Sequence, residues 1–193
     1  MSSTVSCTIE QVEQQVRAWL DQFVVGLNLC PFARPVVTSD MMRLTICSSD
    51  QLQQVAEMFM AELDLIQRSP ESEVATTLLV LPKALADFEE YLSFIENAEA
   101  LIEEMDLVGT IQLASFHPDY QFGGEPKDAV SHYTNRSPYP LIHFLREDMM
   151  ERALKSYPNP EKIPETNIQK LETIGHAQIE KRWNSLKSGN SPK

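Results

Sequence analysis

Apolar residues recur at helical spacing in several segments, and short apolar runs typical of buried strands lie between these segments. Thr8 and Gln11 form a capping-box pattern that predicts a first helix, which should end near Gly26. Ser48 and Gln51 form a second pattern of this kind. Strands are predicted within 42–48, 74–82 and 108–116, and helices over about 52–66 and 85–102.

The chain after the third predicted strand has a different character. The segment 116–140, "FHPDYQFGGEPKDAVSHYTNRSPYP", shows no usable periodicity. Pro140 then suits the first position of a helix that we expect to run to about Lys155. Thr166 opens the capping-box pattern of a predicted final helix, which reaches Trp183.

This alternation of helices and strands predicts an α/β fold. We expect a small sheet of three to four strands, mainly parallel and flanked by helices, with further helices at the C-terminus. A ferredoxin-like mixed sheet is the alternative, and an extra edge strand could lie in 34–39 or 131–134. The predicted organisation is a flexible N-terminus (1–7), a single α/β domain (8–187) and a disordered tail (188–193).

The composition is that of a soluble globular protein large enough to fold around one core without disulfides or metals. The net charge is -12, and it is concentrated in residues 57–106, where 13 acidic residues face two basic ones. An acidic surface repels phosphodiester backbones and no basic stripe offsets it, so the sequence argues against nucleic acid as a partner. Two solvated helix faces account for the acidic block.

The three cysteines show no spacing that suggests pairing, which indicates reduced thiols. The first residues lack the basic and apolar regions of a signal peptide, and no apolar run approaches the ~18–20 residues of a membrane span. We therefore expect a soluble, cytoplasmic protein with no membrane partner.

The segment 116–140 is the best candidate for a functional loop, because ordered loops of this length usually carry function. Its five aromatic residues can pack, and Gly123–Gly124 permits a tight turn. We interpret it as an ordered wall over the carboxyl ends of the strands, where open α/β sheets bind ligands. That edge would also collect Ser48, Lys83 and His117, a possible cradle for an anion.

His117 is the candidate general acid or base, oriented by Asp119 or Asp128, although a histidine at a strand end is commonly structural. Cys30 lies in "CPFARP" (30–35), whose prolines predict a loop. It is a candidate nucleophile if His117 activates it, and a buried inert thiol otherwise.

Binding candidates gather in and around the same segment. Arg136 can hold a carboxylate or phosphate through two parallel N–H bonds, and His143 and Arg146 would share one face of the predicted helix. Each of these side chains could instead have a structural or solvated role. The ligand-binding candidates are Arg34, Lys83, Asn135, Arg136, Ser137, Tyr139, His143 and Arg146.

A metal site is not assigned, because His117, His132 and His143 with Asp128 match no compact ligand motif. No cofactor is predicted either.

Three separated stretches carry a resemblance to a known family: "FVVGLNLCPFARP" (23–35), "LLVLP" (78–82) and "SFHPDYQFGG…NRSPYPLIHFLRE" (115–147). Together they resemble a bacterial and plant family catalogued as domain of unknown function 1415. The resemblance supplies no assignment of a reaction, a cofactor or a catalytic residue. It marks several of the candidates, Cys30 and His117 among them, as parts of the family's signatures.

Three hypotheses about function follow from these patterns. The first is an enzyme acting on a small anionic metabolite that carries a phosphate or carboxylate. The second is a non-catalytic module that binds a ligand or a protein, and the third is a metal-dependent hydrolase.

Overall fold

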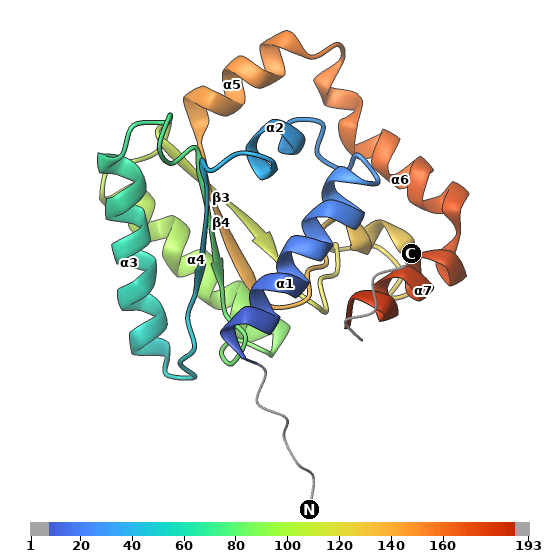
Figure 1. Ribbon diagram of the computed structural model, residues 1–193, viewed down its shortest axis with the longest axis horizontal. Helices are drawn as coiled ribbons and strands as arrows, with labels where there is room; N and C mark the ends of the chain where they lie inside the picture. Colours follow the sequence, from blue (N-terminus) through green and yellow to red (C-terminus); the bar gives the residue numbers. More distant parts are fainter. Residues whose placement is uncertain (1–7, 188–193) are drawn as a thin grey trace, which may run out of the picture.

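A four-stranded mixed sheet lies at the centre of the computed structural model, which describes residues 8–187 (Figure 1). Its strands are β1 (Met42–Ile46), β2 (Thr76–Val80), β3 (Ile111–Phe116) and β4 (Leu141–Arg146), in the order β1-β2-β4-β3. β1 and β2 are parallel, and β4 runs antiparallel to both β2 and β3. Three strands therefore point the same way, with β4 inserted against them, and the predicted α/β class is confirmed.

Helices cover both faces of this sheet (Figure 1). On one face, which we call the α4 face, lie α3 (Leu52–Arg68) and α4 (Phe88–Glu104). The other, the α1 face, carries α1 (Ile9–Trp19), the π-helix η1 (Leu20–Val25), α2 (Ala33–Val37), α5 (Glu147–Ser156), α6 (Ile163–Ile174) and α7 (His176–Lys187). The 3-10 helices η2 (Val130–Thr134) and η3 (Pro160–Lys162) complete the described elements. None of the described helices combines the length and the apolar character needed to cross a membrane.

Neighbouring strand residues point to opposite faces, and this divides the core in two. Leu78 and Val80 of β2 pack with Trp19 of α1, whereas Leu79 packs against α3 and α4 with Phe144. The sequence order β-α-β-α-β-β places both crossover helices on the α4 face and differs from the ferredoxin-like order β-α-β-β-α-β.

The prediction of a helix from Pro140 to Lys155 was wrong in its first half, which is strand β4. The run "LIHFLR" (141–146) is apolar toward both sheet faces because β4 is an inner strand. A short apolar run of this kind also fits a buried helix, so periodicity alone misassigned it. As a result, His143 and Arg146 lie on opposite sides of a strand and not on one helical face.

Several smaller expectations are also corrected. The predicted loop at 30–35 runs into the short helix α2, which admits Pro35 because the first helical turn needs no hydrogen bond from that nitrogen. Neither of the two proposed edge strands is present: 34–39 overlaps α2, and 131–134 lies within η2.

Helix ends show which capping patterns form. The capping box of Thr8 with Gln11 is present at α1, as predicted. At α3 the cap is Gln51, and Ser49 Oγ, not Ser48, accepts its backbone N–H at 3.0 Å. The predicted final helix is two helices, because Gly175, with a φ of 80°, separates α6 from α7. The predicted flexible N-terminus (1–7) and disordered tail (188–193) lie outside the described residues.

Candidate functional site

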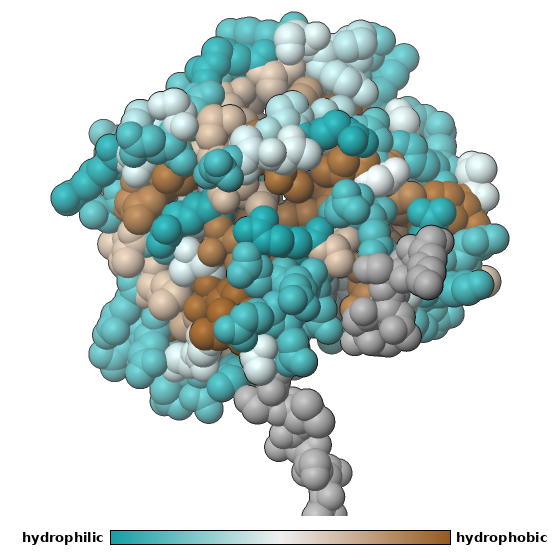
Figure 2. Space-filling view, in the orientation of Figure 1, coloured by the Kyte–Doolittle hydropathy of each residue, from teal (hydrophilic) through white to brown (hydrophobic). Residues whose placement is uncertain are grey.

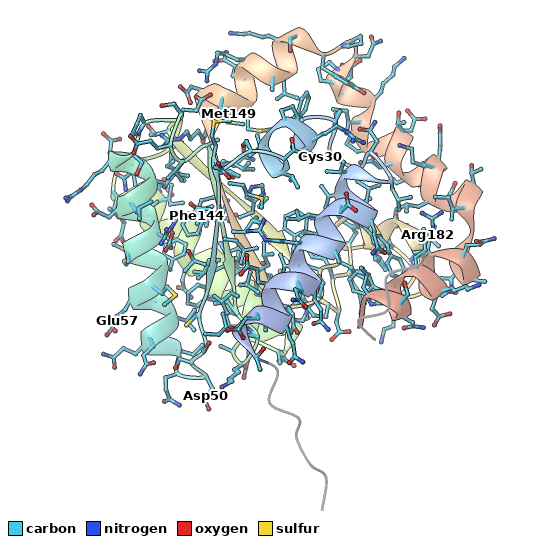
Figure 3. All side chains as sticks on the ribbon, viewed as in Figure 1. Cys30, Asp50, Glu57, Phe144, Met149 and Arg182 are labelled. Atoms are coloured by element: carbon cyan, nitrogen blue, oxygen red, sulfur yellow. The ribbon has the colours of Figure 1, made fainter. Side chains whose placement is uncertain are left out.

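A cavity of about 220 Å³ that opens to the surface lies on the α1 face of the sheet, lined by residues of all four strands, α1 with η1, α2 and α5. In Figure 3, Cys30 beside α2 and Met149 near the start of α5 stand on two sides of this region. Figure 2 shows apolar residues reaching the surface in the middle of the same face. The apolar lining consists of Trp19, Leu20, Val24, Phe32, Ala33, Val36, Val37, Met42, Leu78, Ala114, Phe116, Leu145, Met149 and Met150.

Three lining residues have polar side chains: Cys30, Thr76 and His143. None of the described residues that line the cavity is Lys, Arg, Asp or Glu. Ala114 pairs with His143 across β3 and β4, so a small side chain leaves open space directly beside the imidazole.

His143 is held by a short hydrogen-bond relay. Its Nε2 lies 2.6 Å from Thr76 Oγ1, which also lies 2.6 Å from the carbonyl oxygen of Phe144. That carbonyl can only accept, so the single hydroxyl proton of Thr76 goes to it, and Nε2–H of His143 donates to Thr76. In this tautomer Nδ1 carries a lone pair, and it has no hydrogen-bond partner among the described residues.

Both titratable groups of the cavity are neutral near pH 7. Burial lowers the pKa of His143 to about 4, because the apolar surroundings disfavour the imidazolium. Burial likewise raises the pKa of the Cys30 thiol. This effect is larger than the lowering of the pKa by hydrogen bonds from the backbone of Phe32 and Ala33. The pair therefore lacks the thiolate and imidazolium that nucleophilic catalysis needs.

The π-helix η1 forms part of the cavity wall through Leu20 and Val24. Such helices are rare, and short π segments inside α-helices are frequently found at functional sites. Here η1 continues α1 directly and positions these two side chains over the sheet.

His117 lies on the other side of the sheet from Cys30. It is fully buried against Phe88 and Tyr91 of α4, with ring centroids 5.1 Å from each. Its Nδ1 accepts the backbone N–H of Asp119 at 3.0 Å, and Nε2 lies 3.1 Å from the carbonyl oxygen of Leu85. Burial lowers the pKa of His117, so the ring is neutral with both nitrogens bonded to the backbone.

The segment 116–140 is organised by its own polar side chains. His132 repeats the pattern of His117, accepting the N–H of Phe122 at 3.2 Å and contacting the carbonyl oxygen of Pro126 at 2.8 Å. Asn135 Nδ2 donates to the carbonyl of Ser115 at 3.1 Å, and Ser137 Oγ donates to that of Tyr139 at 2.5 Å. The hydroxyl of Tyr139 donates to Gln15 of α1.

Arg136 is the least constrained of the candidates in this segment. Its guanidinium lies 4.6 Å from the ring centre of Tyr133, a cation–π contact. Its hydrogen bond to the described residues is a long one, from Nε to the carbonyl of Tyr120 at 3.4 Å.

The other sequence-based candidates are dispersed. Arg34, Lys83, Asp119 and Asp128 are exposed. Arg146 is a structural clamp: Nε donates to the carbonyl of Val74 at 3.0 Å, and one terminal nitrogen donates to those of Ile66 and Ser69 at 2.5 and 2.6 Å. The backbone of His117 is hydrogen-bonded to Asn135 and Ser137, on either side of Arg136, at 3.2 and 3.4 Å. Among the described residues, no hydrogen bond joins the side chain of Cys30 to His117 or Arg136.

In the part of the chain that the structure describes, no group of three or more His, Cys, Asp or Glu side chains could hold a metal ion.

Sequence reasoning named Cys30 and His143 but missed the cavity that they share. Apart from Thr76, its other residues are apolar side chains from strands and helices far apart in the sequence, and they carry no motif. The one available signal was the histidine inside the apolar run "LIHFLR" (141–146).

Comparison with protein families covers nearly all of these elements. The family model described as "Protein of unknown function (DUF1415)" matches residues 11–181. The chain belongs to this family. The matched range contains every residue that lines the cavity, so the cavity lies within the DUF1415 domain. No curated protein and no solved structure matches the chain.

Proposed function

We propose that this DUF1415 protein binds a small, uncharged and mainly apolar molecule in the cavity on the α1 face. The observation that carries the proposal is the lining of that cavity, a space of about 220 Å³ lined almost entirely by apolar side chains. An engineered apolar cavity of ~150 Å³ is enough to bind benzene. The space here fits one aromatic ring, or an aliphatic body of similar size, with a short substituent.

The same lining disfavours a charged ligand. Burying an ion without a partner costs far more free energy than the apolar contacts return, and none of the described residues that line the cavity is charged. His143 is neutral and the Cys30 thiol is protonated, so neither offers a charge to an anion. This supports the ligand-binding alternative more than catalysis by Cys30.

Binding can be measured with toluene as the probe and Trp19, which lines the cavity, as the reporter. The chain has two tryptophans, so a Trp183→Phe background leaves Trp19 as the only one. We expect a saturable change in its fluorescence and a rise in melting temperature, since a ligand that binds only the folded state stabilises it.

Two substitutions separate the cavity from other sites. Ala114→Leu places bulk in the cavity and should weaken toluene binding about tenfold or more, whereas Ala100→Leu on the exposed side of α4 should not change it. Ala33→Leu, on the opposite wall, serves as a second blocking variant. Binding of toluene that neither blocking variant reduces would refute the proposal.

A second candidate function is an enzyme that acts on a small anionic metabolite at the segment 116–140. The specific observation in its favour is Arg136, whose terminal guanidinium nitrogens have no hydrogen-bond partner among the described residues. His117 would have to release the carbonyl of Leu85 or the N–H of Asp119 before it could move a proton. The same thermal-shift assay with phosphate and small carboxylates tests this candidate. A shift in the wild type that Arg136→Gln abolishes would support it, and no shift for any anion would exclude it.

A further inference from the structure

Of the three polar side chains that line the cavity on the α1 face, that of His143 has a ring nitrogen, Nδ1, without a hydrogen-bond partner among the described residues. Thr76 donates its proton to the carbonyl of Phe144, so it holds the histidine in the tautomer with hydrogen on Nε2. The tautomer is therefore fixed by the strand backbone and not by the occupant of the cavity. Nδ1 is left as a hydrogen-bond acceptor that no described residue satisfies.

The remaining polar groups of the cavity do not compete for a ligand's donor. The Thr76 hydroxyl is used twice, by His143 and by the carbonyl of Phe144. The thiol of Cys30 is a weak donor and a weak acceptor. Among the described side chains that line the cavity, Nδ1 of His143 is consequently the strong acceptor that is left for a ligand.

The small side chain of Ala114 leaves space beside the imidazole of His143. Ala114 lies opposite His143 in the β3–β4 register and contributes only a methyl group to the lining. The ring of Phe116, whose centroid is 6.2 Å from that of His143, forms an adjoining wall suited to an aromatic face.

We infer that the ligand class of this cavity is a neutral aromatic compound bearing one hydroxyl donor, of the phenol type, whose O–H donates to Nδ1 of His143. The inference rests on the proposed function, because it assigns the polar contact within the same cavity. A donor on an otherwise apolar ring pairs with this nitrogen, whereas a purely apolar ring that covers it leaves it without a partner. The low pKa of His143 keeps Nδ1 available as an acceptor at neutral pH.

The test compares phenol with toluene, which have similar size and shape. Their dissociation constants are measured for wild type and for His143→Leu. The informative quantity is the ratio of the two constants, because the change in ratio between proteins cancels the different hydrophobicity of the probes. We expect the dissociation constant of phenol, relative to that of toluene, to rise about tenfold in His143→Leu. This is the change in affinity that the loss of one hydrogen bond produces.

Two further measurements test the inference if the His143→Leu protein does not fold. Thr76→Val removes the hydroxyl that fixes the tautomer, and it should shift the ratio in the same direction. In wild-type protein labelled with ¹⁵N-histidine, phenol but not toluene should move the Nδ1 resonance of His143.

The outcomes separate this inference from the proposed function. Phenol and toluene both binding, with an unchanged ratio in the variants or no change at Nδ1, would overturn the phenol assignment and leave apolar binding standing. Neither probe binding would overturn both. Benzoate competing as well as phenol would also contradict the inference, since no cation lines the cavity to hold it.

Discussion

At the scale of single residues, polar side chains in this protein mostly serve the backbone. His117, His132 and Arg146 each hydrogen-bond to main-chain groups of loops or helix ends. Buried polar groups need such partners, because an unpaired one costs about 1–3 kcal/mol. Most of the residues that looked like a ligand site are thus engaged in holding the fold. His143 differs, because one of its nitrogens is left for the cavity.

Arg146 gives the clearest prediction about stability. It joins the end of β4 to carbonyls in the last turn and cap of α3, where a cation also suits the helix dipole. Arg146→Met should lower the free energy of unfolding by about 2 kcal/mol or more in urea denaturation, since several charge-assisted hydrogen bonds are lost.

The matched control for Arg146 is Arg152→Met. Arg152 is an exposed arginine of α5 that pairs with Asp148 and Glu71 at the surface. Exposed pairs contribute little, so this variant should unfold almost like the wild type. Equal stability of the two variants would show that Arg146 is not a structural clamp.

At the scale of elements, the π-helix η1 and the glycine that follows it shape one wall of the cavity. Gly26 caps η1 in a helical conformation, with a φ of -66°. A Cβ at this position would lie 2.6 Å from the backbone oxygen of Gln22 and 2.7 Å from that of Asp21, closer than real contacts allow. The glycine is therefore required by space and not by its backbone angle.

Gly26→Ala should destabilise the protein and loosen η1, although alanine ordinarily favours a helical glycine site by about 1 kcal/mol. The test is therefore whether the melting temperature of Gly26→Ala, measured by circular dichroism, falls or rises relative to that of the wild type. Gly123→Ala is the control, because a Cβ there meets nothing within 4 Å, and its stability should stay close to that of the wild type. A stabilised Gly26→Ala protein would disprove the steric argument.

Helix α5 is the other element that matters for the cavity. Met149 and Met150 line the cavity, yet no residue of α5 is buried. Methionine side chains adapt to irregular gaps, so this wall can adjust to ligands of slightly different shape.

At the scale of the whole molecule, the two faces of the sheet are packed differently. The α4 face is filled by α3 and α4, with Phe59, Leu79 and Phe144 fully or almost fully buried. The α1 face is covered by short helices from both ends of the chain, and the cavity lies beneath them. The protein therefore combines a close-packed half that supports the sheet with a half that leaves room for a ligand.

Acid stability is a property of this whole arrangement. The pKa of His143 is lowered to about 4, and that of His117 is lowered as well, both chiefly by burial. Below the ordinary histidine value near 6.5, the unfolded chain binds protons that the folded protein does not. The free energy of unfolding should then fall as the pH drops from about 6.5 to 4, with His143 contributing at most roughly 3 kcal/mol.

The measurement is urea denaturation of wild type and His143→Gln across this pH range. The variant should lose part of the slope, since glutamine does not titrate. His176→Gln, which removes an exposed histidine of α7, should keep the wild-type slope. If the free energy of unfolding falls equally with pH in wild type and His143→Gln, His143 takes up its proton at the same pH in the folded and the unfolded chain, and the prediction is wrong.

The sequence by itself determined the α/β class, the first three strands, and the helices α1, α3 and α4. These elements depend on local patterns: the capping box at Thr8, apolar stripes at helical spacing, and β-branched runs such as "VATTLLV" (74–80). It also named Cys30, in an irregular stretch between prolines, and His143, although it placed His143 on a helix face shared with Arg146 and not in a strand.

Only the tertiary structure decided strand β4, the roles of the buried polar residues, and the cavity. An apolar run covered on both faces has no periodicity that separates strand from helix, so pairing with β2 and β3 fixed residues 141–146. Nε2 of His117 and the guanidinium of Arg146 are held by carbonyls far away in the sequence. The cavity joins residues from Trp19 to Met150, and such a space exists only once the separate elements have packed together.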